Sequence, residues 1–162
     1  MIRAAIFGRK PRRTLGRIVA LAAGAYIVFG HLLIPVRGAG PSMLPTLQDG
    51  QFLFVNTLAY LGAEPRRGDI VGISLAGRRL LYIKRIVGLP GERLRIDAGT
   101  VYVDGVPLEE PYVERRRPWD IGEVVLRDDE FLVIGDNRGM TANNHDFGKA
   151  RRERIIGRVV RW

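Results

Sequence analysis

Residues 18–34 form an uncharged apolar run near the start of the chain, so any fold must either bury this run or place it in lipid. As a helix, its 17 residues would span roughly 25 Å at about 1.5 Å per residue, close to the thickness of a bilayer's hydrocarbon core. Extension to Thr14 and Val36 would complete the crossing, with Arg17 reaching the lipid headgroups. The sequence therefore predicts one N-terminal transmembrane helix.

The positive charge of the chain is concentrated before this run. Residues 1–17 carry six Lys and Arg and no acid, and removing them from the formal net charge of +9 leaves +3 on the other 145 residues. This distribution indicates a basic tail rather than a nucleic-acid-binding surface. Arg37 is the single cation close behind the run, so the positive-inside rule places the N-terminus in the cytoplasm and the following domain across the membrane.

A cleaved signal peptide is the alternative interpretation of the apolar run. Its apolar stretch would be unusually long, and residues 38–40, Gly-Ala-Gly, are the nearest small-residue cleavage site. We interpret the run as a retained anchor. The predicted division is a basic cytoplasmic tail and anchor over 1–36, followed by a catalytic domain over 37–162.

The part after the anchor is predicted to be mainly β. Short apolar or alternating runs, separated by Gly, Pro and Asp turns, indicate strands. They cover 51–56, 70–75, 80–87, 93–96, 100–103, 123–126, 130–134 and 155–161, with an Asp-Gly hairpin inside 101–108. The polar segments 109–122 and 135–148 are expected to be loops, the first a solvated Arg-rich surface. Many short strands and few helices favour one antiparallel barrel-like or sandwich-like domain.

Ser42 lies between Pro41 and Pro45, which are expected to hold the backbone extended and stiff. Such a segment can present one hydroxyl in a fixed direction, but a serine hydroxyl needs a base beside it to act as a nucleophile. The alternative is a Pro-rich turn that joins anchor to domain. The chain has no cysteine, and its histidines are His31, inside the apolar run, and His145.

Lys84 interrupts the apolar strand predicted over 80–87. Alternation places Lys84 and Arg85 on opposite faces, so one of the two cations is expected inside or at a cleft. A lysine among apolar groups has its charged form disfavoured, so its pKa falls and it can serve as a general base, which arginine cannot. The alternative is that Lys84 faces solvent. A third polar cluster, residues 135–138, is typical of a turn but is also suited to bracing a site.

Together these clusters resemble the type I signal peptidases of the bacterial S26 serine-protease family. The resemblance rests on Pro41–Leu47, Tyr82–Glu92, Gly135–Arg138 with Phe147-Gly148, and the anchor just upstream. It implies a Ser/Lys protease with a membrane-associated, β-barrel-like catalytic domain, Ser42 as nucleophile and Lys84 as base. The Ser42 amide would be one oxyanion donor, and no metal or cofactor is implied. The implied partners are preprotein signal peptides with small residues before the cleavage site, the bilayer and the secretion translocon, but not nucleic acid.

The chain departs from the family pattern at several positions. Gly40 occupies a position where some members have a serine that acts as a second oxyanion donor. Thr141 stands where a serine usually orients the lysine, and it keeps a hydroxyl. Asn143 and His145 stand where an Asp and an Arg normally pair. The family pattern further suggests that Asp136 pairs with Arg85.

Three other functions remain possible from the sequence. A related fold performs regulatory self-cleavage with Ser and Lys, although such proteins are soluble and normally carry a DNA-binding segment. A dedicated processing peptidase would act on a narrow substrate set. A non-catalytic membrane-tethered module would use its Arg-rich surface to bind anionic lipid or nucleic acid.

Overall fold

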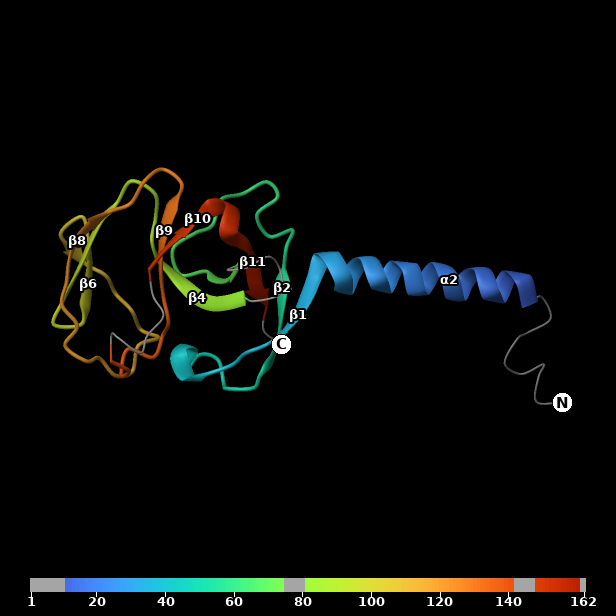
Figure 1. The fold of residues 1–162 in the computed structure, drawn as a ribbon, viewed down its shortest axis with the longest axis horizontal. Coiled ribbons are helices and arrows are strands. Elements are labelled where there is room, and N and C mark those ends of the chain that lie inside the picture. The colour runs from blue at the N-terminus through green and yellow to red at the C-terminus, as the bar shows by residue number, and fades with distance from the viewer. Residues whose placement is uncertain (1–10, 75–80, 142–147, 161–162) are drawn as a thin grey trace.

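The computed structural model describes residues 11–74, 81–141 and 148–160, and Figure 1 shows one long helix projecting from a β-rich body. The helix α2, Pro11–Ile27, continues as the π-helical segment η1, Val28–Leu32. The stretch from Arg12 to Leu32 has 21 residues and is not buried inside the fold. At about 1.5 Å per residue it measures roughly 31 Å, which matches a bilayer's hydrocarbon core. In length and composition, this helix is able to cross a membrane.

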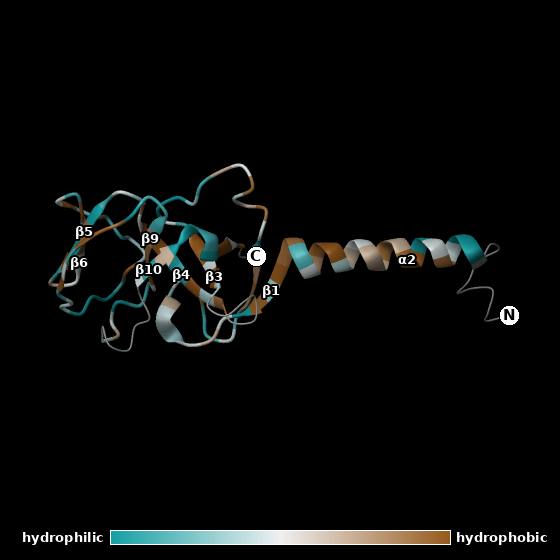
Figure 2. Ribbon diagram, turned by 45° about the horizontal axis from the view of Figure 1, so that its top comes forward, coloured by the Kyte–Doolittle hydropathy of each residue, from teal (hydrophilic) through white to brown (hydrophobic). Residues whose placement is uncertain are grey.

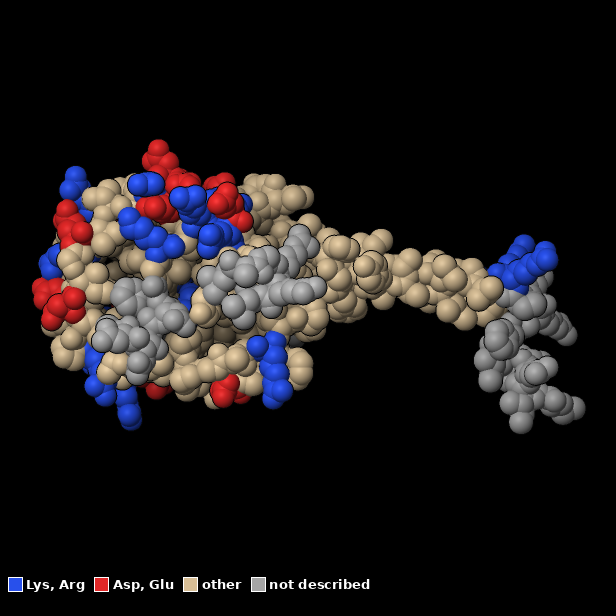
Figure 3. Space-filling view, in the orientation of Figure 1, with Lys and Arg blue, Asp and Glu red and all other residues tan. Residues whose placement is uncertain are grey.

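The surface of this helix is apolar between its ends. Figure 2 colours most of its length brown or pale, and Figure 3 shows Lys and Arg at its far end but none along its shaft on that face. The helix stops earlier than the sequence predicts, because Leu33 and Ile34 already belong to the strand β1, Leu33–Arg37. Pro35 explains the difference, since proline disfavours helical geometry at the preceding residue.

The junction between helix and body contains no linker. Thr57 lies just after the strand β2, Phe52–Asn56, and its amide donates to the carbonyl of Leu32 at 3.0 Å. The Thr57 hydroxyl donates to the carbonyl of His31 at 2.8 Å. The end of the helix is therefore fastened to the sheet on which β1 continues.

The body consists of antiparallel strands in two sheets. The strands beyond β2 are β3 Ile70–Ser74, β4 Leu81–Gly88, β5 Arg93–Asp97, β6 Thr100–Val103, β7 Val106–Pro107, β8 Ile121–Val125, β9 Glu130–Ile134, β10 Gly148–Arg151 and β11 Ile155–Val160. The larger sheet has the order β1-β2-β11-β3-β4-β9-β10 and the smaller β7-β6-β5-β8. The mainly antiparallel fold with one N-terminal apolar helix is thus confirmed. In the part of the chain that the structure describes, both strand orders are open, so the barrel-like closure stays a prediction.

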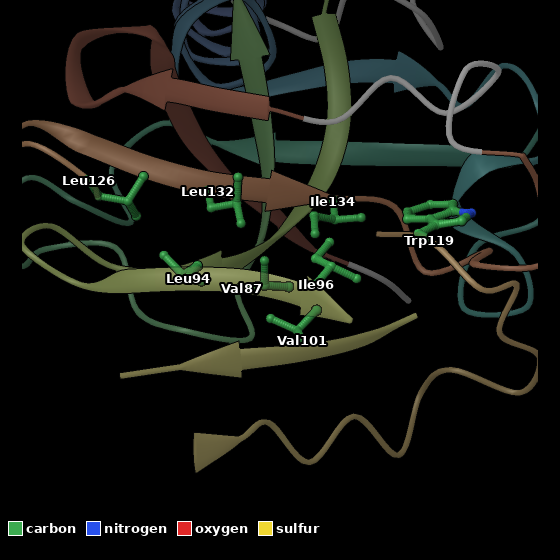
Figure 4. Close-up of a cluster of buried hydrophobic side chains, with 8 residues drawn as sticks. All are labelled: Val87, Leu94, Ile96, Val101, Trp119, Leu126, Leu132 and Ile134. Atoms are coloured by element: carbon green, nitrogen blue, oxygen red, sulfur yellow. The ribbon is translucent and has the colours of Figure 1, made fainter. Parts of the chain in front are cut away.

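The main apolar core lies between the two sheets. Figure 4 shows its eight buried side chains, which come from β4, β5, β6, β9 and the segments beside them: Val87, Leu94, Ile96, Val101, Trp119, Leu126, Leu132 and Ile134. A second cluster packs β3, β4, β9, β10 and β11 together. A third, formed by Met43, Leu47 and Leu53, fixes the segment around Ser42 to the larger sheet. The strand of Lys84 and the turn of Ser42 therefore rest on packed side chains.

The predicted strands agree with the observed ones to within a few residues where the structure describes them. The sequence missed β1 and β10. The first was hidden in the apolar run, and the second, Gly-Lys-Ala-Arg, lies partly in the segment 135–148 that was expected to be a loop. Its ladder pairs Gly148 with Val133 and Arg151 with Glu130 through backbone groups, which a side-chain pattern does not reveal.

Candidate active site

Ser42 lies in a short 3-10 turn, Pro41–Met43, and the extended backbone expected from its two flanking prolines is wrong at this position. Proline at the first residue of a helical turn loses no hydrogen bond, and its fixed φ suits that turn. Leu44 beyond the turn is extended. Met43 and Leu47 are 5% and 4% exposed. Burying each such side chain contributes roughly 1.5–3 kcal/mol, which holds the turn and its half-buried serine in place.

Lys84 is the buried one of the two neighbouring cations on β4. It is 3% exposed, and β4 pairs it with Val71 of β3. Its Nζ lies 2.8 Å from Oγ of Ser42 and 5.8 Å from the centre of the Tyr82 ring. The structure therefore brings the two predicted catalytic residues, 42 positions apart in the chain, into hydrogen-bond contact.

Both residues line one cleft of about 440 Å³. Its walls include residues 34–40 and the start of β4, Leu81–Lys84. Val36, Met43 and Ile83 give these walls an apolar surface beside the serine. The lining also includes the polar side chains of Arg37, Gln48 and Tyr82.

Gly40 forms part of this wall through its backbone. Its φ of +89° lies in the region that favours glycine, so a side chain at this position would be strained. Its amide donates to Oδ1 of Asp49 at 2.9 Å. The neighbouring Gly38 donates to the carbonyl of Gln51 and accepts from the amide of Gly50, each at 2.9 Å. The Gly40 amide is therefore engaged by Asp49, and the wall is held by a paired loop.

Asp136 and Arg85 form the pair that the family pattern suggests. The Arg85 Nε donates to Oδ1 of Asp136 at 2.8 Å, and its Nη2 donates to Oδ2 at 2.6 Å. Asp136 is 1% exposed, and Arg85 also donates to the carbonyl of Gly68 at 2.7 Å. This two-bond pair fixes β4, the strand of Lys84, to the loop that follows β9.

A second buried ion pair was missed, because segment 109–122 was expected to be a solvated loop. Glu110 is 5% exposed and Arg138 is 1% exposed, and they form a salt bridge. Arg116 donates to the other Glu110 oxygen at 3.0 Å, and the Tyr112 hydroxyl donates to Glu110 at 2.9 Å. We call these four residues the Glu110 network. Arg116 is exposed, yet its guanidinium reaches the buried carboxylate of Glu110.

The Glu110 network changes the pKa of Tyr112. Burial, together with the charge and hydrogen bond of Glu110, raises the pKa of the Tyr112 phenol. The Tyr112 hydroxyl therefore stays protonated and donates a hydrogen bond to the Glu110 carboxylate. Trp119, buried in the main core and bonded to the carbonyl of Met140 at 3.0 Å, was a signal in the sequence that this segment packs against the body.

Asn137 is a further residue that the sequence analysis assigned no individual role. Its amide N–H donates to the carbonyl of Ser42, and its side-chain Nδ2 donates to the carbonyl of Pro41, each at 3.0 Å. The cluster at 135–138 therefore contacts the turn of Ser42 directly. Thr141, at the end of the described part of this loop, is exposed, whereas Asn143 and His145 lie outside the described residues.

Within residues 11–74, 81–141 and 148–160, no three His, Asp or Glu side chains converge as a metal-binding group. The chemistry available at the cleft is that of a hydroxyl, an amine and backbone amides. This set suits acyl transfer from an amide bond to serine.

Comparison with known proteins identifies the family of the chain. The profile of the family "Signal peptidase, peptidase S26" matches residues 12–162. A probable signal peptidase I-2 from Synechocystis sp. is 37% identical over 124 residues, which cover 73% of this chain and 57% of that protein. Signal peptidase I from Leptolyngbya laminosa is 36% identical, covering 91% of this chain and 75% of that protein. Signal peptidase I T from Bacillus subtilis is 34% identical, covering 88% and 80%. The chain therefore belongs to the signal peptidase I family of serine peptidases, peptidase S26.

Proposed function

We propose that this protein is a membrane-anchored serine endopeptidase that removes signal peptides from translocated preproteins, with Ser42 as nucleophile and Lys84 as general base. The observation that carries the proposal is the 2.8 Å contact between Nζ of Lys84 and Oγ of Ser42 inside one cleft. The burial of Lys84 supports the role of base, because burial disfavours the ammonium form and favours the neutral amine.

The geometry supports the following reaction. Neutral Lys84 takes the proton of Ser42 as Oγ attacks the scissile carbonyl carbon, and the carbonyl oxygen becomes an oxyanion near the Ser42 amide. The C–N bond then breaks, and the Lys84 ammonium gives its proton to the leaving amine. Lys84 next takes a proton from water, whose oxygen attacks the acyl-enzyme ester. The acid product leaves, and the Ser42 hydroxyl is restored.

The cleft also supports the substrate class. The apolar residues in its lining, such as Val36 and Ile83, favour small apolar side chains before the scissile bond. Signal peptides delivered by the secretion translocon present such residues in an extended segment.

The test of the dyad uses preprotein cleavage in detergent by Ser42→Ala, Lys84→Ala and Lys84→Arg. All three variants are expected to lose activity, and Ser42→Ala and Lys84→Ala are expected to leave the fold intact. Lys84→Arg should be as inactive as Lys84→Ala because a guanidinium stays charged. Activity in Lys84→Arg would remove lysine from the role of base. A panel of unrelated preproteins in the same assay separates a general peptidase from one with a narrow substrate set.

The anchor is proposed to cross the membrane with the N-terminus in the cytoplasm and the catalytic domain outside. This orientation is supported by the six cations before Ile18 and the single Arg37 soon after the run. Because β1 begins at Leu33, we place the boundary of the catalytic domain there rather than at residue 37. Externally added protease should digest the domain in right-side-out vesicles and spare it in inverted ones; the reverse pattern would reject the orientation.

A further inference from the structure

The peptide unit that joins Pro41 to Ser42 has two polar ends with different tasks. Its N–H belongs to Ser42 and is the oxyanion donor of the proposed reaction, and its carbonyl belongs to Pro41. We propose that Asn137 is a positioning residue that holds this peptide unit from its carbonyl end, so that the Ser42 N–H stays aimed at the oxyanion. This inference rests on the proposed function and adds to it a residue that acts on the transition state through the backbone.

Three donors fix the two carbonyls on either side of Ser42. Pro41 accepts from Nδ2 of Asn137 at 3.0 Å and from the amide of Leu44 at 3.1 Å. The carbonyl of Ser42 accepts from the amide of Asn137 at 3.0 Å. Because a peptide unit is planar, a carbonyl held in direction also fixes the N–H at the other end of the unit.

The hydrogen bonds at the carbonyl also strengthen the donor at the opposite end. A carbonyl that accepts hydrogen bonds polarises its peptide unit, and condensed-phase estimates of this cooperativity are roughly 10–30% per bond. Asn137 is not among the described residues that line the cleft. It is therefore expected to act on the Ser42 amide without contacting the substrate.

Asn137 is itself held firmly, because both of its chain neighbours are buried in ion pairs. Asp136 pairs with Arg85, and Arg138 pairs with Glu110. The amide of Arg138 also donates to the carbonyl of Asp136 at 2.9 Å. The two ion pairs thus fix the backbone on either side of Asn137, the residue that bonds the Ser42 turn. In this way both buried ion pairs would contribute to catalysis.

The test replaces Asn137 with Ala and with Asp. Alanine removes the Nδ2 donor, and aspartate keeps the shape while placing an oxygen against the Pro41 carbonyl. Both variants retain the backbone bond to Ser42. We expect kcat for a signal-peptide substrate to fall on the order of tenfold, about 1.4 kcal/mol, with KM changed by less than about twofold.

A peptide aldehyde supplies a readout that a merely structural role would not change. Ser42 Oγ adds to the aldehyde carbon, its proton passes to Lys84, and the aldehyde oxygen takes the position of the oxyanion. The inhibition constant should rise by about the same factor by which kcat/KM falls. The same peptide ending in an alcohol forms no oxyanion, so its affinity should not change.

Arg117→Ala is the matched control. Arg117 donates to the carbonyl of Gly139 at 2.8 Å, so this variant removes another side-chain tether of the same loop without touching the Pro41–Ser42 unit. It should keep kcat and aldehyde affinity within about twofold of wild type.

Three results would overturn the inference. They are wild-type kcat and aldehyde affinity in folded Asn137 variants, equal losses for aldehyde and alcohol, and failure of both variants to fold, which would make Asn137 structural. The proposed function fails separately. If Ser42→Ala still cleaves, the dyad is wrong, whereas an inactive Ser42→Ala beside a fully active Asn137→Ala rejects the positioning role alone.

Discussion

Among the residues that the structure describes, two cations are buried, and their surroundings differ. Arg138 forms a salt bridge with Glu110, which also accepts hydrogen bonds from Tyr112 and Arg116. Lys84 instead contacts the hydroxyl of Ser42, at the edge of an open cleft. A guanidinium keeps its charge when buried and needs a carboxylate, whereas an amine can lose its proton and become a base.

The comparison shows how the fold assigns different tasks to similar groups. Around Arg138, charge is neutralised by opposite charge, which fixes a loop. Around Lys84, burial and the neighbouring hydroxyl of Ser42 suit the proposed role of a base. Lys84 contacts Ser42, and Arg138 is the chain neighbour of Asn137, which bonds the Ser42 turn. The Arg138–Glu110 ion pair therefore supports the segment that holds the contact between Ser42 and Lys84.

Replacement of each cation by methionine should give the largest contrast. Arg138→Met leaves the Glu110 carboxylate buried without its main counter-charge, and we expect a loss of about 3–5 kcal/mol in the free energy of unfolding. Lys84→Met removes a buried amine and should leave that free energy nearly unchanged, while activity falls roughly 10²- to 10⁴-fold. Denaturant titration and preprotein cleavage measure the two effects. Equal stability losses in both variants would remove the distinction.

The pH dependence of activity and of stability should differ in the same way. Only the neutral amine of Lys84 accepts a proton, so kcat/KM should rise about tenfold per pH unit below the pKa of this lysine and then level off. Initial rates measured where chemistry is rate-limiting test this; a flat profile from mildly acidic to alkaline pH would contradict it.

The Tyr112 phenol of the Glu110 network should affect stability at high pH. Because burial raises the pKa of Tyr112 above its ordinary value of 10.0, its contribution to stability is fully present below that pH and is lost as pH rises through the folded-state pKa. Unfolding measured along the same pH series should therefore show no gain in stability that parallels the rise in activity.

Substitution of Thr141 should have the smallest effect, and it tests how the Lys84 amine is oriented. If its hydroxyl orients the Lys84 amine, Thr141→Ser should keep most activity. Thr141→Val, similar in shape, should lose on the order of tenfold in kcat, about 1.4 kcal/mol, with the melting temperature unchanged. Its exposure in the structure makes ordinary loop behaviour the competing expectation. Wild-type cleavage by Thr141→Val would exclude the hydroxyl from the site.

The sequence predicted the pairing of Ser42 with Lys84 because each residue type has few uses in its context. A lysine inside an apolar strand and a serine between prolines are both unusual, and the family pattern implies that they act together. Asn137 could not be assigned in this way, because its contacts are to backbone carbonyls of a turn that was expected to be extended. The burial of Glu110 was missed because an acid near several arginines is typical of a solvated surface, and only tertiary packing buries this one.

The strands were predictable where side chains alternate or where Gly and Asp end a run. β1 was not, because its residues continue the hydropathy of the helix, and only Pro35 signals the change. β10 was not, because its pairing uses backbone groups beneath a polar sequence. Local patterns therefore located most elements, and long-range pairing decided the remainder.

Because β1 begins directly after η1, the helix is joined to the catalytic body at a fixed distance. Thr57 fastens the end of the helix to the body, and the five residues of β1 rise by about 3.3 Å each, or roughly 16 Å in total, along the cleft towards Ser42. With the helix in the bilayer, the height of Ser42 above the lipid is thereby fixed. The enzyme would then select substrates by geometry as well as by side chain, because only a bond held at that height can reach the serine.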